Sequence, residues 1–188
     1  MKKYILLAAA VFLSACGSEN VIYRPADQIL PQHIKSIAVR NFSNKSQQFG
    51  LEEKLTLKII DEFLKDGQYR IVPETEADGI LSGEITHYIL TPIQYDQNMV
   101  TMVYKLNVTV GARFLDRKGN FYLWQEPALQ TTKIYSASTL PGGLTEEQAR
   151  EQIWEVLAKD IVKRTVQGFG SATSVSDKKI PETPKKQQ

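Results

Sequence analysis

A strict alternation of apolar and polar side chains, from residue 102 to residue 114, constrains the fold more than any other feature of the chain. The apolar positions are every second residue, namely Met102, Tyr104, Leu106, Val108, Val110, Ala112 and Phe114. Most residues between them are polar. Because successive side chains of a strand point to opposite faces of the sheet, the segment predicts a long strand with one buried and one open face. An open face favours antiparallel neighbours.

Four further segments predict strands around this one. They are a largely buried strand over Ile34–Phe42 with an exit turn at Asn41–Asn44, a short strand over Tyr69–Val72, a strand over Ile80–Leu90 that Pro92 ends or kinks, and a long strand over Phe121–Tyr135 that Pro127 interrupts. In the third strand the residues expected to share one face are Leu81, Gly83, Ile85 and Ile89. The loop Asp116–Asn120 predicts a hairpin, with Gly119 available for a left-handed position.

Two segments have the spacing of amphipathic helices. The first covers 51–64, and its expected apolar stripe is Leu51, Leu55, Ile59 and Phe63, widened by Leu57, Ile60 and Leu64. Gly67 is its expected stop. In the second helix Thr145 is the expected N-cap and Gln148 completes a capping box. The expected apolar stripe of this helix is Ile153, Leu157 and Ile161, with Ala149, Val156 and Val162 beside it.

The resulting order, β-α-β-β-β-β-α, predicts an α+β fold. The most economical arrangement is a two-layer sandwich, with both amphipathic helices on one face of a four- to five-stranded mixed, mainly antiparallel sheet. We expect a single domain over residues 34–170, preceded by a tether over 16–33. Residues 171–188 are rich in Ser, Lys and Pro without a hydrophobic pattern, which predicts a disordered polar tail.

The first fifteen residues indicate export. A short basic start at Lys2 and Lys3 precedes nine apolar residues, too few to span a bilayer but typical of a secretory signal peptide. The following Leu13-Ser14-Ala15-Cys16 resembles the lipobox of bacterial lipoproteins. That resemblance implies that residues 1–15 are removed and that Cys16 carries a lipid anchor. Gly17 after the cysteine resembles the sorting signal of lipoproteins that reach the outer membrane.

Composition and motifs argue against most other classes. The formal net charge of +2 is too balanced for a nucleic-acid binder. One cysteine excludes an internal disulfide framework, and two histidines leave little room for a metal site, so we expect no metal and no cofactor beyond the lipid. The chain has no phosphate-binding loop, nucleophile elbow or zinc-protease motif. His33 adjoins the tether and His87 a strand, so neither suggests catalysis, and we expect no enzyme.

An ordered set of short motifs then points to a family. Its members are the stretch Leu30–Val39, Phe42-Ser43-Asn44, Gly50-Leu51-Glu52, Ala77–Ile85, Pro92 before Tyr95-Asp96, Leu123-Trp124 and Thr145–Ala149. The set is similar to LptE, the lipopolysaccharide-assembly lipoprotein family, from about Leu30 to Gly168. This resemblance implies a role as a plug and assembly factor for a large outer-membrane β-barrel, LptD. It also implies contact with lipopolysaccharide and residence at the periplasmic side of the outer membrane.

Contact with lipopolysaccharide phosphates requires local cations. The candidates are Lys105, Arg113 and Lys133 on the predicted open face, and Arg117 and Lys118 in the hairpin loop. Neighbouring strands are expected to add Glu84, Thr86 and Tyr88 to this face. The start of the chain also resembles other periplasmic lipoproteins, which leaves a regulatory or export role open. In that alternative the protein is an activator of penicillin-binding proteins or a curli-export-like component.

Overall fold

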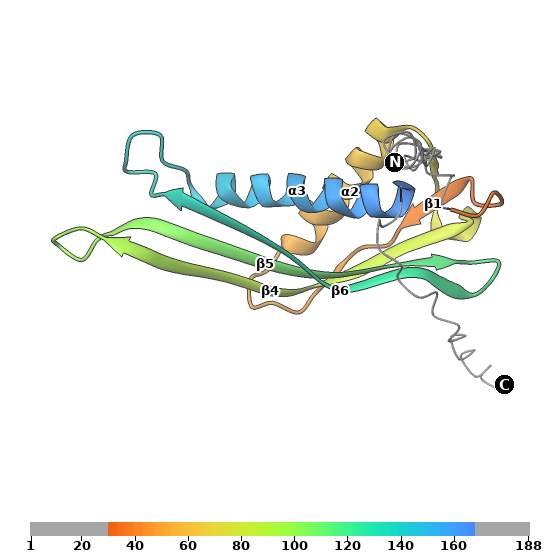
Figure 1. Ribbon diagram of the computed structural model, residues 1–188, viewed down its shortest axis with the longest axis horizontal. Coiled ribbons are helices and arrows are strands. Elements are labelled where there is room, and N and C mark those ends of the chain that lie inside the picture. Colours follow the sequence, from red (N-terminus) through yellow and green to blue (C-terminus); the bar gives the residue numbers. More distant parts are fainter. Residues whose placement is uncertain (1–29, 168–188) are drawn as a thin grey trace, which may run out of the picture.

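The computed structural model describes residues 30–167, and Figure 1 shows their arrangement. The elements in chain order are β1 (Ser36–Val39), β2 (Ser43–Asn44), α2 (Leu51–Asp66), β3 (Arg70–Ile71), the short 3-10 helix η1 (Glu74–Glu76), β4 (Gly79–Tyr95), β5 (Thr101–Asp116), β6 (Phe121–Ser136) and α3 (Glu146–Gln167). Both helices lie on one side of the sheet, which confirms the predicted α+β two-layer architecture. The segments 1–15, 16–29 and 168–188 lie outside the described residues.

The sheet is mixed, with the order β3-β1-β4-β5-β6, and β2 pairs with β4 beside β1. The short strands β1, β2 and β3 pair in parallel, whereas the long strands β4, β5 and β6 are antiparallel. The sixth strand, β2, replaces the exit turn expected at residues 41–44. Its two residues pair with Glu84 and Ile85 of β4, and the buried Phe42 precedes them.

Both helices begin where the sequence indicates, and α2 also ends there. Gly67 follows α2 in the left-handed conformation, with φ of 70°, and its N–H donates to the carbonyl of Phe63. The capping box of α3 is formed, because the Gln148 N–H donates to Thr145 Oγ1 and the Thr145 N–H donates to Gln148 Oε1. These bonds satisfy backbone donors that the first helical turn leaves free.

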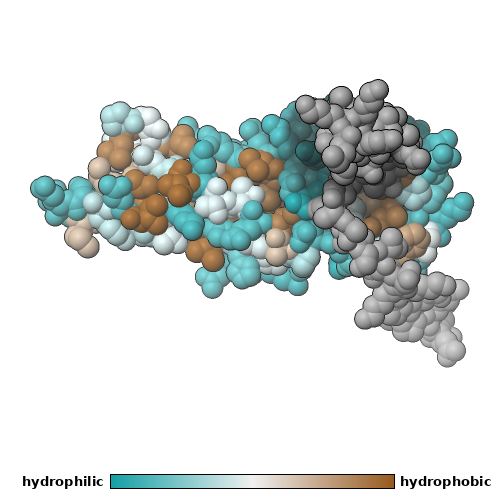
Figure 2. All heavy atoms as spheres, in the orientation of Figure 1, coloured by the Kyte–Doolittle hydropathy of each residue, from teal (hydrophilic) through white to brown (hydrophobic). Residues whose placement is uncertain are grey.

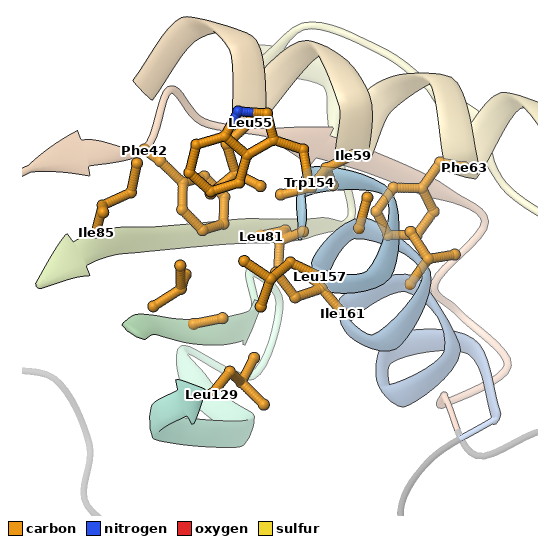
Figure 3. Close-up of a cluster of buried hydrophobic side chains, with 14 of the residues drawn as sticks. Phe42, Leu55, Ile59, Phe63, Leu81, Ile85, Leu129, Trp154, Leu157 and Ile161 are labelled. Carbon is orange, nitrogen blue, oxygen red and sulfur yellow. The ribbon is translucent and has the colours of Figure 1, made fainter. Parts of the chain in front are cut away.

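The core lies between the helices and the sheet (Figure 3). From α2 it takes Leu55, Ile59 and Phe63, and from α3 Trp154, Leu157 and Ile161. The alternate residues of β5 from Leu106 to Phe114 are buried beneath them, as the period-two pattern predicts. The predicted burial is wrong for three residues of the helices, since Leu57, Leu64 and Val156 are more than half exposed. Each of them lies on the flank of its helix, and in α3 the fully buried Trp154 belongs to the core instead of Val156.

A β-bulge in β4 reverses the facing of its second half. The pairing with β5 shifts between Ile85 and His87, so one extra residue enters β4. Leu81 and Ile85 face the core before the bulge, whereas Tyr88 and Leu90 pack against it afterwards. The expected core position of Ile89 is therefore wrong, and Ile89 is half exposed. The expected place of Tyr88 on the open face is wrong for the same reason.

A bulge in β6 likewise exchanges the two faces for the second half of that strand. The β5–β6 register shifts between Val110 and Ala112, where Pro127 and Ala128 lie in the irregular stretch of β6. Beyond it Lys133 pairs with Leu106, and Ile134 pairs with Lys105. Since directly opposed residues of an antiparallel pair share a face, Lys133 lies on the helix side and Ile134 on the open side. The prediction that Lys133 belongs to the open face is wrong.

Neither proline ends its strand. Pro92 lies in β4 beyond the two residues paired to β2, where the described residues place no strand on that side of β4. Pro127 lies in β6, at the edge of the sheet. Proline lacks the N–H that an inner strand would need, so both are tolerated at an edge or a bulge. In the β5–β6 turn the left-handed residue is Asn120, with φ of 53°, rather than Gly119.

Candidate functional surface

The open face of the sheet, opposite the helices, presents mainly polar side chains in its central part. Alternate residues of β5 supply Lys105, Asn107, Thr109 and Arg113, as the alternation predicts. Their partners on β6 are polar at three positions, Gln125, Gln130 and Thr132. No helix of the described residues packs on this face, since α2 and α3 both cover the other one. The face is therefore available to a ligand or a partner protein.

Arg113 is held in place by two neighbours. Its Nε donates to Ser82 Oγ at 3.3 Å, and its guanidinium lies 5.5 Å from the centre of the Tyr122 ring. A guanidinium over an aromatic face gains a cation–π attraction that also limits its movement. Arg113 remains exposed, so it is a positioned cation on an accessible surface.

A shallow depression of about 280 Å³ lies beside Arg113. Its lining includes Ser43, Glu84, Gly111, Gln125 and Pro127. Gly111 contributes no side chain, and the β6 bulge brings the Pro127 carbonyl close to it. The Lys45 ammonium, 2.8 Å from Glu84, holds the pKa of that carboxyl below its usual value, and the charge of Arg113 acts in the same direction. The depression thus combines one anchored cation, Arg113, with an ionised carboxylate, Glu84, whose charge is paired with Lys45.

Lys105 and Lys133 lie nearer the other end of the long strands. Lys105 is exposed on the open face, eight residues from Arg113 along β5, which corresponds to roughly 27 Å. Lys133 lines a different depression of about 300 Å³, together with Val103, Ile134 and Leu144. Since Lys133 and Lys105 point to opposite faces, the five candidate cations do not form one cluster.

Arg117 and Lys118 lie in the β5–β6 turn at the opposite end of the sheet. Arg117 Nη1 donates to the carbonyls of Glu74, Thr75 and Ala77, at distances of 2.6 to 3.3 Å. This guanidinium fastens the turn to η1 and its flanking residues. Lys118 is exposed, and its backbone N–H donates to the buried Asp116, which also bonds His33 Nε2 at 3.0 Å.

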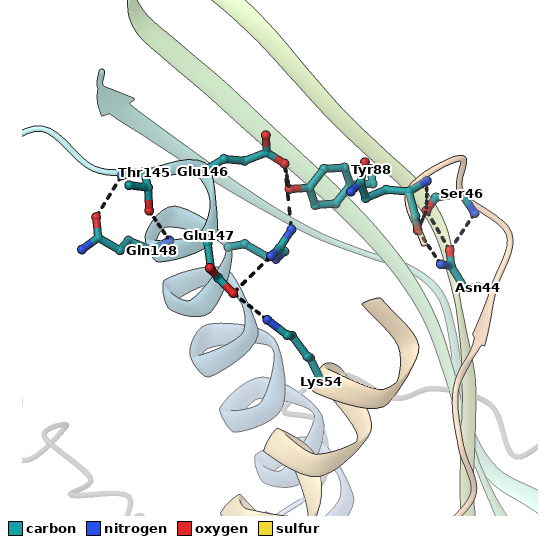
Figure 4. A network of polar contacts seen from close by, with 10 residues as sticks. Asn44, Ser46, Lys54, Tyr88, Thr145, Glu146, Glu147 and Gln148 are labelled. Atoms are coloured by element: carbon teal, nitrogen blue, oxygen red, sulfur yellow. Dashed lines mark hydrogen bonds and ion pairs between the residues drawn. The ribbon is translucent and has the colours of Figure 1, made fainter. Parts of the chain in front are cut away.

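The helix side of β4 carries a polar connection to α3 that the sequence does not reveal (Figure 4). The Tyr88 hydroxyl donates to Glu146 Oε1 at 2.6 Å. In the same first turn of α3, Glu147 accepts a hydrogen bond from Lys54 of α2 at 2.7 Å. Burial and the Glu146 carboxylate raise the pKa of the Tyr88 hydroxyl. The connection depends on the β4 bulge, which no local sequence signal marks.

Large apolar side chains gather at the end of the molecule that carries the β4–β5 turn. They are Ile93, Tyr95, Met99 and Val100, all at least 46% exposed. Figure 2 shows hydrophobic atoms gathered behind the hydrophilic extremity of that end, on the left of the view. The exposed Ile89 and Ile134 follow along the open face. The sequence pattern did not indicate this patch, because residues 93–100 lie between the two predicted strands, 80–90 and 102–114.

The described residues provide neither a cluster of metal ligands nor a membrane-spanning helix. Residues 30–167 contain no group of three or more His, Cys, Asp or Glu side chains that could hold a metal ion. Neither helix of this part of the chain combines the length and apolarity needed to cross a membrane. His87 is exposed on β4, where its Nδ1 lies 3.1 Å from the Thr86 hydroxyl.

Solved structures of similar fold come from several bacteria. Protein CT253 of Chlamydia trachomatis aligns with a TM-score of 0.50 at 10% identity, over 70% of this chain and 95% of that one. Protein XCC0632 of Xanthomonas campestris aligns with a TM-score of 0.49 at 8% identity, over 71% and 84%. Lipoprotein GNA1162 of Neisseria meningitidis aligns with a TM-score of 0.43 at 13% identity, over 68% and 98%. At these identities the likeness concerns the fold alone.

Sequence comparison is more specific. A search of curated proteins found no significant match. The family model described as LptE, lipopolysaccharide-assembly, matches residues 34–166, which is almost the whole of the described part. The matched stretch runs from two residues before β1 to the last turn of α3, so it includes every strand and all but the last residue of the helices. The chain belongs to the LptE family of lipopolysaccharide-assembly proteins.

Proposed function

We propose that this protein is a lipid-anchored lipoprotein on the periplasmic side of the outer membrane. In this role it plugs an LptD-type β-barrel, helps that barrel to assemble, and assists the insertion of lipopolysaccharide into the outer leaflet. The observation that carries the proposal is the family match over residues 34–166. The role is non-catalytic and requires no cofactor other than the anchor.

The geometry of the sheet supports a plug. The lumen of a large outer-membrane barrel is polar, so a protein inside it needs hydrogen-bonding groups on its outer surface. Both helices use one face of the sheet for the core, which leaves the polar row of Lys105, Asn107, Thr109 and Arg113 directed outward. Such a face matches a polar wall better than it matches another hydrophobic core.

The same face supports contact with an anionic ligand. Arg113, oriented by Ser82 and Tyr122, is suited to a bidentate bond with a phosphate. On this face Lys105 supplies a further cation near the apolar end. Lys133 supplies one on the helix side, within the depression it shares with Val103 and Leu144. Lys118 extends the proposed set to the far turn. Arg117 is the weakest member, because three backbone carbonyls already occupy its Nη1.

The anchor is proposed at Cys16, after removal of residues 1–15. Each buried lipid methylene contributes about 0.8 kcal/mol, so two or three acyl chains hold a domain firmly on a membrane. Leu30 is buried in the core and fixes the start of the domain. The intervening chain can span up to about 48 Å when extended. Intact-mass analysis of the native protein tests this: a Cys16→Ala chain should lack the diacylglycerol mass that the parent chain carries.

The partner is tested by purifying the tagged full-length lipoprotein from its own outer membrane in mild detergent. We expect a large β-barrel protein in a one-to-one complex, identified by mass spectrometry. A peptidoglycan synthase as the retained protein, or a ring of this chain alone, would contradict the proposal. Either result would favour the regulatory or export role that the start of the sequence leaves open.

A further inference from the structure

We propose that the turn between β4 and β5 is a lipid-insertion element, whose apolar side chains enter the acyl-chain boundary of a phospholipid bilayer. The element, here called the apolar tip, consists of residues 93–100 with Ile93, Tyr95, Met99 and Val100 as its apolar side chains. It lies at the opposite end of β4 and β5 from the turn near which the ordered domain begins. The contact with lipid would be made before the sheet enters a barrel, so this inference does not depend on the identity of the barrel partner.

Exposure is the first support. Met99 is 76% exposed and Val100 56%, and both adjoin the half-exposed Tyr95 and Ile93. Scattered surface apolar residues need no explanation, but four within eight residues at a protruding turn form a patch. Tyr95 has a hydroxyl at the end of an apolar ring, the kind of side chain that prefers a membrane interface.

The backbone of the tip is the second support. Asp96 Oδ1 accepts the N–H groups of Asn98 and Val100, each at 2.8 Å, and the Asp96 carbonyl accepts that of Met99 at 3.2 Å. The Asp96 N–H in turn donates to the Val100 carbonyl at 2.9 Å. A segment that leaves water must satisfy its own donors, since each unpaired N–H in hydrocarbon costs several kcal/mol. Four N–H groups of this tip meet that requirement without water.

The conformation of Met99 is the third support. Its φ of 63° lies in the left-handed region, which costs an L-residue about 1–2 kcal/mol. Glycine would occupy this position without strain, so the turn holds a large apolar side chain outward at a cost. The Asp96 bonds rigidify the turn, and a rigid tip loses little conformational freedom when it inserts.

Charge selects the kind of bilayer. Lys105 and Lys133 lie in the rows behind the tip, beside Ile134 and Leu106. The backbone of Lys105 is roughly 17 Å behind Val100 along β5, and Lys133 lies one row further. Their long side chains extend toward the headgroup layer of a shallowly bound membrane, where each cation gains about 1 kcal/mol from an anionic surface. The tip therefore fits a leaflet that contains anionic phospholipid, with insertion shallow enough to leave the polar Asp96, Gln97 and Asn98 of the same turn in the headgroup layer.

The test uses the full mature chain with Cys16→Ser, so that no acyl anchor contributes to binding. Vesicles of phosphatidylglycerol mixed with phosphatidylcholine are the probe, in a sedimentation assay. Met99→Ser together with Val100→Ser should lower the partition coefficient about tenfold, since the two side chains remove their apolar area from the interface. Met99→Leu with Val100→Ile should restore it. Phe49→Ser is the matched control, because Phe49 is 91% exposed but stands alone in the loop before α2.

An environment-sensitive fluorophore on a Met99→Cys variant gives a second readout. Its emission should shift to the blue with these vesicles, whereas a Phe49→Cys label should not shift. Equal partitioning of the parent and the double serine variant, or no shift at residue 99, would overturn the proposal. Binding that appears only when lipopolysaccharide is added would also overturn it, and would assign the tip to that ligand instead. The double serine variant should still capture the barrel protein. Loss of vesicle binding in the parent chain with barrel capture intact would therefore count against the lipid-insertion proposal alone.

Discussion

The hydroxyl of Tyr88 donates to the carboxylate of Glu146 at 2.6 Å and joins the second half of β4 to the first turn of α3. The two residues are 58 positions apart in the chain. The bond exists because the bulge after Ile85 turns Tyr88 toward the helices. It fixes the first turn of α3 over the second half of β4.

Replacing Tyr88 by Phe should lower the free energy of unfolding by about 1.5–3 kcal/mol at neutral pH, the range for a hydrogen bond to a charged group. Chemical denaturation of the parent chain and the variant measures the difference. Tyr95→Phe is the control, because the Tyr95 side chain is exposed at the tip and should be neutral. Equal losses for the two variants would mean that the Tyr88 bond adds nothing.

The same residue predicts a dependence on alkaline pH. The folded pKa of Tyr88 is raised above the unfolded value near 10, first by burial and then by Glu146. Above about pH 10 the unfolded chain loses a proton that the folded chain keeps, so stability falls as pH rises. Tyr88→Phe removes this contribution, so the stability difference between the two chains should begin to shrink at about pH 10 and shrink further toward about pH 12. Parallel curves over that interval would contradict the assignment.

The bonds of Asp78 predict how the stability of the fold changes at acidic pH. Its Oδ2 accepts the Ser36 hydroxyl at 2.7 Å and the backbone N–H groups of Lys35 and Ser36 at 3.0 Å, which lower the pKa of the carboxyl. Asp78→Ala should cost about 2 kcal/mol at pH 7. Because a lowered folded pKa stabilises only above the unfolded value near 3.9, that difference should disappear as the pH falls below it. A difference that persists unchanged at pH 2 would refute the ionic origin of the effect.

Gly83 is a packing prediction. A Cβ at residue 83 would overlap the Phe42 ring and the Gly111 carbonyl oxygen. Gly83→Ala should therefore destabilise the fold by about 3 kcal/mol in thermal or chemical unfolding. Adding Phe42→Leu should recover part of the loss, since the two changes act on one contact. Gly50→Ala, where only the φ of 75° opposes a side chain, should cost about 1 kcal/mol. A Gly83→Ala chain no less stable than Gly50→Ala would contradict the close packing.

The open-face cations predict a loss of ligand affinity. Lys105→Glu combined with Arg113→Glu should weaken the binding of purified lipopolysaccharide at least tenfold, because each charge-assisted bond to phosphate is worth about 1.5–3 kcal/mol. Lys159→Glu on the exposed side of α3 is the matched charge reversal and should bind as the parent does. Unchanged binding by the double variant would remove Lys105 and Arg113 from the ligand site.

Periodicity predicted the parts of this fold in which one residue step equals one change of face. The apolar row from Leu106 to Phe114 is buried as expected, and the caps at Thr145 and Gly67 define the helix ends. The register shifts between the long strands are what the pattern could not supply, and two of them change the face of residues named above. One extra residue after Ile85 and another at Pro127 exchange the faces of Tyr88 and Ile89, and of Lys133 and Ile134. Such an exchange depends on pairing between distant strands.

The candidate surface divides in the same way. Lys105 and Arg113 lie in the uninterrupted part of β5, so their outward direction followed from the alternation. Arg117 was expected to be free in a loop, yet it bonds carbonyls some 40 residues earlier in the chain. The apolar tip was not expected at all, because the predicted strand covered only Ile80–Leu90, with Pro92 expected to end or kink it. Local sequence carries no information on which edge of a sheet stays unpaired.

The most direct test of the account is photocrosslinking from the open face in living cells. A photoreactive residue at Gln130 or Thr132, both on the open side of β6, should give an adduct with a large outer-membrane β-barrel protein. The same residue at the buried Leu157 should crosslink only within the chain. Adducts from Gln130 and Thr132 with a peptidoglycan synthase, or only with a second copy of this chain, would contradict the claim that the protein is a barrel plug.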